Sequence, residues 1–152
     1  MKSNIVLGAC LALTTSICLW GSTALAQDDA MDDDAMDMAS FTQEQVDAGQ
    51  REYTRSCQDC HGPNLDDGEF GGPPLVGYYF REKWFGMSVA GLYGFTASAM
   101  PPDRPGQLSA ETYADLVAFI LSKNGVEPGE TPLPSDMDAL SNLGLPVQEP
   151  IE

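Results

Sequence analysis

The feature that most constrains this chain is a run of five residues holding two thiols and an imidazole, CQDCH at positions 57–61. His61 is the chain's one histidine, and Cys57 and Cys60 are its two cysteines outside the apolar N-terminal run. Three kinds of site use thiols and an imidazole at this spacing: a disulfide redox centre, a zinc site and a covalently attached haem. The rest of the sequence has to decide among them.

The first 26 residues are typical of a cleavable secretory signal peptide. Lys2 supplies a positive start, a mainly apolar run follows over residues 5–20, and Ala24–Ala26 fits the small-x-small cleavage pattern. Two alternatives stay open: an uncleaved anchor, because about 20 mostly apolar residues can just span a bilayer, and lipoprotein processing at Cys10. We expect cleavage, export to the periplasm and no transmembrane span in the mature chain, because no later apolar run is long enough.

The rest of the chain divides into three predicted parts. Residues 27–40 form an acidic leader, which we expect to be disordered because six aspartates and no branched or aromatic side chain leave little surface to bury. Residues 41–125 form the folded domain, and residues 126–152 form a proline-rich C-terminal tail. Capture of a soft metal by the leader's methionines is a less favoured reading of that segment than a solvated spacer.

Helix signals dominate the predicted domain. Thr42 and Gln45 form a capping box that opens an amphipathic helix of about 14 residues, running to Cys57. Ser109 caps a second amphipathic helix, which ends at Gly125. We expect a glycine–proline loop and one or two further helices between them. No strand pattern persists, so the sequence predicts a small all-α fold.

The charge balance limits the possible partners. Without Lys2, 6 basic residues stand against 23 acidic ones, a formal charge of −17 for the mature chain. So acidic a protein does not offer a groove that follows phosphates, which excludes nucleic acid as a partner. A charged protein partner would present a positive face.

Among the three kinds of site, a covalent haem fits best. A disulfide centre normally has its thiols at the start of a helix, whereas Cys57 ends one. A zinc site needs four ligands, and the cluster supplies three. Two cysteines on one helical turn can bond both vinyl groups of a porphyrin, and His61 then offers its nitrogen to the iron. A domain of roughly 85 residues has a marginal core, so we expect a largely unfolded apoprotein.

Met100 is the predicted sixth ligand of the iron. It follows His61 by 39 residues and precedes two prolines, which end any helix and stiffen the loop. Of the other methionines, Met87 is expected in the core and Met137 in the tail. Ligation by His61 and Met100 leaves no open position on iron, which favours electron transfer over catalysis.

The sequence resembles class I c-type cytochromes over residues 41–125, through AGQREYTRSCQDCHG, GGPPLVG, AMPPDRPGQLS and the last helix. The resemblance implies about four or five helices around one haem c. It also implies that the Pro73 carbonyl accepts a hydrogen bond from His61 Nδ1, a contact that fixes the ligand's tautomer. The residues implied to line or contact the haem are Leu75, Phe80, Trp84 and Leu92, with the Trp84 N–H as a candidate partner for a propionate.

The same resemblance implies how the two main helices cross. Gly49 and Tyr53 would pack on the C-terminal helix near Tyr113 and Leu116. The glycine would let the two backbones approach closely.

A longer stretch, residues 80–125, narrows the resemblance to cytochromes associated with quinoprotein alcohol or sugar dehydrogenases. It implies a periplasmic carrier that takes one electron from a dehydrogenase and passes it to an oxidase or another acceptor. Two alternatives stay open: a cytochrome subunit bound within a dehydrogenase complex, and a haem enzyme with an open sixth position.

Overall fold

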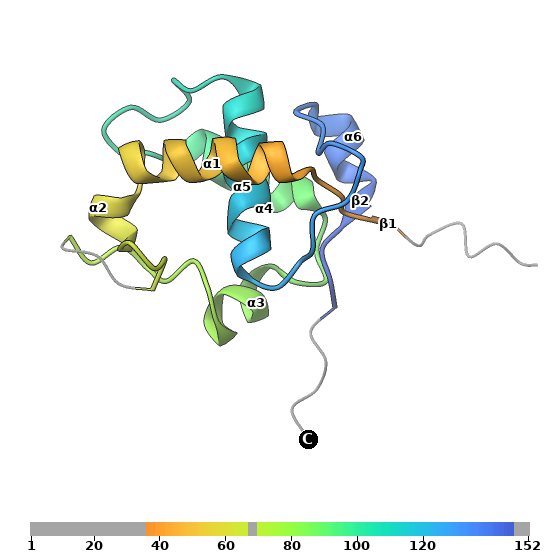
Figure 1. Cartoon of the computed structure of the whole chain (residues 1–152), viewed down its shortest axis with the longest axis horizontal. Coiled ribbons are helices and arrows are strands. Elements are labelled where there is room, and N and C mark those ends of the chain that lie inside the picture. The colour runs from red at the N-terminus through yellow and green to blue at the C-terminus, as the bar shows by residue number, and fades with distance from the viewer. Residues whose placement is uncertain (1–35, 67–69, 148–152) are drawn as a thin grey trace, which may run out of the picture. The chain divides into compact units, whose positions relative to one another are not determined.

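The computed structural model describes residues 36–66 and 70–147, and the chain there is mainly helical (Figure 1). The expected signal peptide and residues 27–35 of the expected leader lie outside the described residues. In chain order the elements are β1 (Asp37–Met38), α1 (Gln43–Ser56), α2 (Gln58–His61), α3 (Tyr78–Trp84), α4 (Val89–Ala99), α5 (Ala110–Lys123), α6 (Met137–Ser141) and β2 (Leu143–Gly144). The predicted all-α class is confirmed, with six helices in the described residues rather than four or five.

The capping signals in the sequence set the two longest helices. Before α1, the Thr42 hydroxyl accepts a hydrogen bond from the Gln45 N–H, and the Gln45 side chain accepts one from the Thr42 N–H, each at 3.3 Å. Before α5, the Ser109 hydroxyl accepts a hydrogen bond from the Thr112 N–H at 3.1 Å. Both helices have 14 residues, the length predicted for α1.

Helices α1 and α5 cross at a glycine, as expected. A Cβ atom on Gly49 would lie 2.0 Å from the backbone oxygen of Asp115 and 2.8 Å from the Phe119 Cβ. The Tyr53 and Phe119 rings pack with their centroids 5.2 Å apart. On α5 the crossing therefore centres on Asp115 and Phe119. Leu116, expected near the crossing, directly follows Asp115 and lines the cavity described below.

The C-terminal segment belongs to the folded core, which differs from the predicted tail. Leu133, Leu140 and Leu145 are at most 3% exposed, and the Gln45 side chain holds the Leu133 backbone through two hydrogen bonds of 2.7 and 3.0 Å. Leu133 and Leu140 are seven positions apart, but Pro134 interrupts the segment and Leu145 does not continue the spacing, so no sustained helical or strand period signals their burial. The boundary predicted at residue 125 is too early.

The end of the predicted leader is also ordered. Strand β1 pairs in parallel with β2, in the register Asp37 to Leu143 and Met38 to Gly144, and Ala39 is buried. The prediction of disorder therefore does not hold for residues 36–40, because a partner strand from the far end of the chain satisfies their backbone groups.

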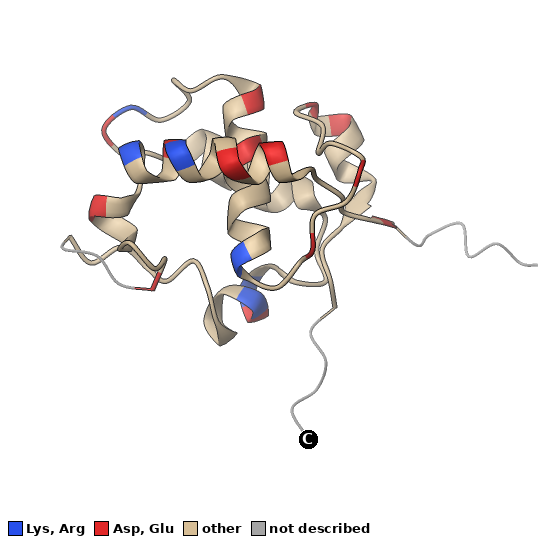
Figure 2. Cartoon of the chain, viewed as in Figure 1, with Lys and Arg blue, Asp and Glu red and all other residues tan. Residues whose placement is uncertain are grey.

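The basic residues fall into two groups (Figure 2). Arg51, Arg55 and Arg104 lie on the C-terminal half of α1 and on the loop after α4. Arg81, Lys83 and Lys123 lie on α3 and in the last turn of α5. None of the helices in the described ranges is long and apolar enough to cross a membrane.

Candidate haem-binding site

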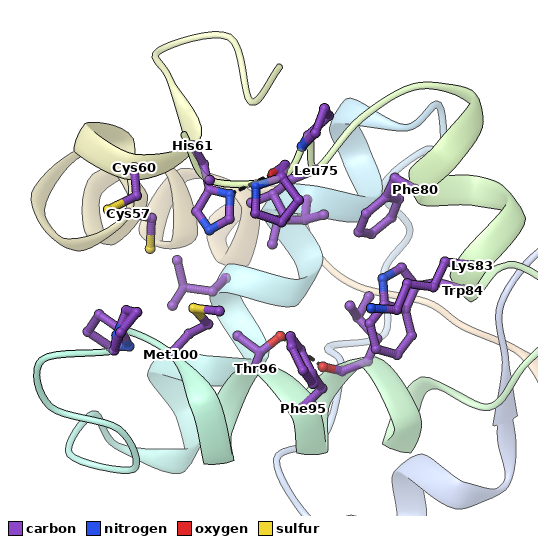
Figure 3. Close-up of a pocket in the computed structure, with 18 of the residues that line it drawn as sticks. Cys57, Cys60, His61, Leu75, Phe80, Lys83, Trp84, Phe95, Thr96 and Met100 are labelled. Atoms are coloured by element: carbon purple, nitrogen blue, oxygen red, sulfur yellow. Dashed lines mark hydrogen bonds between the residues drawn. The ribbon is translucent and has the colours of Figure 1, made fainter. Parts of the chain in front are cut away.

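A cavity of about 440 Å³ lies between α1–α2, the loop at residues 70–75, α3, α4 and α5 (Figure 3). Its lining is mainly apolar. All seven residues predicted for the site line it: Cys57, Cys60, His61, Pro73, Leu75, Trp84 and Met100. Phe80 and Leu92, which the resemblance placed against the haem, line it too.

His61 forms one wall of the cavity and is held in one orientation. Its Nδ1 lies 2.8 Å from the carbonyl oxygen of Pro73, as the resemblance implies. A carbonyl can only accept a hydrogen bond, so Nδ1 carries a proton, and in the neutral tautomer of the imidazole the lone pair is then on Nε2. The side chain is 7% exposed, so water does not compete strongly for this contact.

A glycine makes that contact possible. A Cβ on Gly72 would lie 2.5 Å from the backbone oxygen of Cys60 and 3.0 Å from Nδ1 of His61. The Gly72 N–H donates a hydrogen bond to the same Cys60 oxygen at 2.7 Å. The close approach of this loop to α2 therefore depends on the missing side chain, and it delivers the Pro73 carbonyl to the imidazole.

Helix α2 itself is braced by a buried tyrosine of α1. The Tyr53 hydroxyl donates a hydrogen bond to the backbone oxygen of Gly62 at 2.5 Å. Burial, together with the nearby Cys57 and Asp66, raises the pKa of Tyr53. The phenol therefore stays protonated and keeps donating at any pH near neutrality.

Met100 comes from the opposite wall. It is the C-cap of α4, and its backbone oxygen accepts a hydrogen bond from the Tyr113 hydroxyl at 2.9 Å. Figure 3 shows its side chain directed into the cavity, across from the His61 ring. Met87 and Met137 are each 46% exposed and lie outside the cavity lining. The expectation that Met87 belongs to the core is wrong.

Cys57 and Cys60 lie together at one end of the cavity, and both are free thiols. Burial, reinforced by the Glu52 carboxylate, raises the pKa of Cys57 to about 12. A thiol-disulfide centre needs the opposite shift, because the thiolate is the attacking form. Within the described residues, no group of three His, Cys, Asp or Glu side chains is arranged to hold a metal ion. Both competing interpretations of the motif lose support.

The other end of the cavity carries a cation on aromatic rings. The Lys83 Nζ lies 4.8 Å from the centre of the Trp84 ring and 5.0 Å from that of Phe95. The two rings are 5.6 Å apart. Figure 3 shows this group away from the cysteines, beyond His61 and Met100. The cavity thus has two thiols at one end and an ammonium group at the other.

Sequence reasoning missed several residues that support the site. The buried Asn124 donates hydrogen bonds to the Leu75 and Ile120 carbonyls at 2.8 and 2.9 Å, which ties the loop next to His61 to the end of α5. In the sequence, an asparagine before Gly125 is an ordinary helix end and carries no functional signal. Tyr113 was expected only near the crossing of the two main helices, but its hydroxyl also fixes the backbone of Met100.

The comparisons with known proteins agree with this geometry. The sequence model of the family described as "Cytochrome C oxidase, cbb3-type, subunit III" matches residues 44–120, which include both cysteines, His61, Pro73 and Met100. The chain belongs to this family. Its c-type cytochrome domain supports the class I resemblance, and it implies haem c and electron transfer with redox partners. The comparison with curated proteins found no match.

The cavity of this family member fits a haem c. Its size lies within the range of cofactor pockets, and its lining is apolar where a porphyrin face would lie. The two free thiols suit thioether bonds to one edge of the ring. The imidazole and the thioether of His61 and Met100 face each other from opposite walls. The family match lends no support to the narrower resemblance to cytochromes of quinoprotein dehydrogenases.

Proposed function

We propose that this protein is a periplasmic electron carrier that holds one haem c, attached through Cys57 and Cys60 and ligated by His61 and Met100. The observation that carries the proposal is that an oriented imidazole and a thioether enter the same apolar cavity from opposite walls, with two free thiols at one end. The predicted signal peptide supports the periplasmic location. Bound there, haem c would supply a one-electron Fe(III)/Fe(II) couple.

The residues of the chain would tune that couple. The Pro73 carbonyl increases the basicity of His61 through the hydrogen bond to Nδ1. The thioether of Met100 favours the reduced state and raises the potential. The apolar lining would keep water away from a haem bound there. If His61 and Met100 both ligate the iron, no position would be left for a substrate, which favours a carrier over a haem enzyme.

The experiment is to express the full chain with a working c-type maturation system and to compare two methionine variants. We expect a pyridine haemochrome spectrum of c-type haem, a mass increased by one haem, and the weak red charge-transfer band of Met–Fe(III) ligation. Met100→Leu should lose that band and bind cyanide readily. Met87→Leu, an equivalent change at an exposed methionine, should keep the band. A colourless protein, or a band that survives Met100→Leu, would contradict the proposal.

For its partners, we propose a dehydrogenase as donor and a respiratory oxidase as acceptor. The oxidase subunit named in the family description supports the acceptor, and the resemblance to dehydrogenase-associated cytochromes supports the donor. The same description favours a second candidate, a cytochrome subunit bound within a larger complex. Recovery of the full chain in a periplasmic extract, with reoxidation by added membranes, would favour the free carrier. Co-purification with membrane subunits would favour the bound form.

A further inference from the structure

The loop between α4 and α5 carries Met100 and is tied to α1 by an arginine. Four residues beyond Met100, the Arg104 Nη2 donates a hydrogen bond to the Ser56 Oγ at 2.6 Å. The Ser56 hydroxyl in turn donates to the Glu52 Oε1 at 2.5 Å. These contacts join the loop to a helix 48 positions earlier in the chain.

The carboxylate at the end of this chain of contacts is almost fully enclosed. Glu52 is 8% exposed, so a well-oriented partner is worth more to it than to a surface carboxylate. Its second oxygen, Oε2, accepts a hydrogen bond from the Arg55 Nη1 at 2.8 Å. Arg55 comes from the same helix, and its side chain is 72% exposed. Glu52 therefore bonds one arginine locally and reaches the other, across the molecule, through Ser56.

The Arg104–Ser56 contact lies close to a predicted haem attachment residue on one side and to the predicted ligand Met100 on the other. Ser56 directly precedes Cys57 and lines the cavity, and Arg104 is joined to Met100 by a short turn, in which the Arg104 N–H donates to the Pro101 oxygen at 3.0 Å. On the α5 side, Tyr113 holds the Met100 backbone oxygen. The loop is therefore held at two points, by Ser56 on α1 and by Tyr113 on α5.

We infer that Arg104 is a positioning residue for Met100, the proposed iron ligand, and this inference rests on the proposed function. Through Ser56 and Glu52 it closes the Met100 loop onto the helix that presents Cys57. A loop held by few contacts opens locally far more often than the whole domain unfolds. Loss of the Arg104 contact would therefore increase the fraction of molecules in which Met100 leaves the iron.

The test compares Arg104→Gln with Arg55→Gln in the haem-loaded full chain. Both changes remove one positive charge near Glu52, but Arg104→Gln alone frees the Met100 loop. Cyanide binding to the ferric protein reports the opening, because cyanide can bind when Met100 dissociates. We expect Arg104→Gln to bind cyanide roughly tenfold faster, the effect of losing one hydrogen bond to a charged group, and to weaken the red charge-transfer band. Arg55→Gln should stay within about twofold of wild type.

A second variant, Ser56→Ala, breaks the hydrogen bonds that connect Arg104 to Glu52 without a change of charge, and it should also speed cyanide binding. It supplies the test if Arg104→Gln does not yield haem-loaded protein. Equal acceleration of cyanide binding in Arg104→Gln and Arg55→Gln would show a general charge effect and overturn the inference. A wild-type rate of cyanide binding in Arg104→Gln would also overturn it. If Ser56→Ala is the variant used, a wild-type rate in that variant has the same meaning. Wild-type protein without the charge-transfer band would instead refute the proposed Met100 ligation, so the two failures are distinguishable.

Discussion

Replacing Gly49 by alanine would test how closely α1 and α5 approach each other. The added Cβ would lie 2.0 Å from the backbone oxygen of Asp115 and 2.6 Å from its carbonyl carbon, where ordinary contact begins at 3.4 Å. Backbone atoms inside a helix cannot rotate away as the end of a side chain can. The two helices would have to separate by more than an ångström, which would disturb the packing of Tyr53 on Phe119.

The expected cost follows from two opposing effects. Overpacking of a closely packed core costs about 1–3 kcal/mol, and a clash with rigid backbone belongs at the upper end of that range. Alanine is a better helix former than glycine by about 0.8–1 kcal/mol. We therefore expect a net loss of about 2 kcal/mol in the free energy of unfolding.

Gly91→Ala is the matched control, because this glycine also lies inside a helix, α4. The nearest atom to its added Cβ is the Met87 Cε, at 3.6 Å, so we expect a gain of about 0.8–1 kcal/mol. The assay is guanidinium unfolding of the haem-loaded protein, followed by circular dichroism. A Gly49→Ala midpoint equal to or above that of Gly91→Ala would refute the close crossing.

Three further predictions concern the C-terminal segment and the cavity. Leu140→Ala should cost about 2–5 kcal/mol of unfolding free energy, because Leu140 is fully buried. Met137→Ala on the same helix should cost little, and equal effects of the two changes in guanidinium unfolding would contradict the burial of Leu140. Gly72→Ala should displace the Pro73 carbonyl from His61 and raise the reduction potential, because the imidazole becomes a weaker donor to iron; an unchanged potential in a spectroelectrochemical titration would refute that role. Lys83→Gln should lower the reduction potential by on the order of 10 mV, and by more at low salt. The reason is that a cation at the cavity edge favours the less positive, reduced state. The absence of a salt-dependent fall in the same titration would count against this role of Lys83.

Much of the site could be predicted because its signals are local. CQDCH predicts two haem anchors and one iron ligand within five residues, and the prolines that follow Met100 mark it as the second predicted ligand. The Pro73 contact came through the family resemblance, and the structure has the expected hydrogen bond. Haem attachment itself, the signal peptide and the periplasmic location stay predictions.

The exposure of Met87 and the supporting contacts of the site could not be predicted in the same way. Arg104 reaches Ser56 across 48 positions, and Asn124 reaches Leu75 across 49. A polar residue in a loop or at a helix end has many ordinary uses, and its distant partner leaves no periodic trace in the sequence. The exposure of Met87 also leaves no trace in the sequence, because its surroundings depend on how α3 and α4 pack.

The sequence by itself determined the helical class and the starts of α1 and α5, and it predicted the chemistry of the cavity, since a capping box, a serine N-cap, a paired-thiol motif and a methionine before prolines act over a few residues. Only the tertiary structure decided that residues 36–40 and 126–147 belong to the domain. Strand β1 finds its partner more than a hundred positions away, and the leucines of the C-terminal segment are buried by surfaces that exist only once the helices have packed. Burial and backbone pairing across such distances depend on the assembled fold, and no local pattern specifies them.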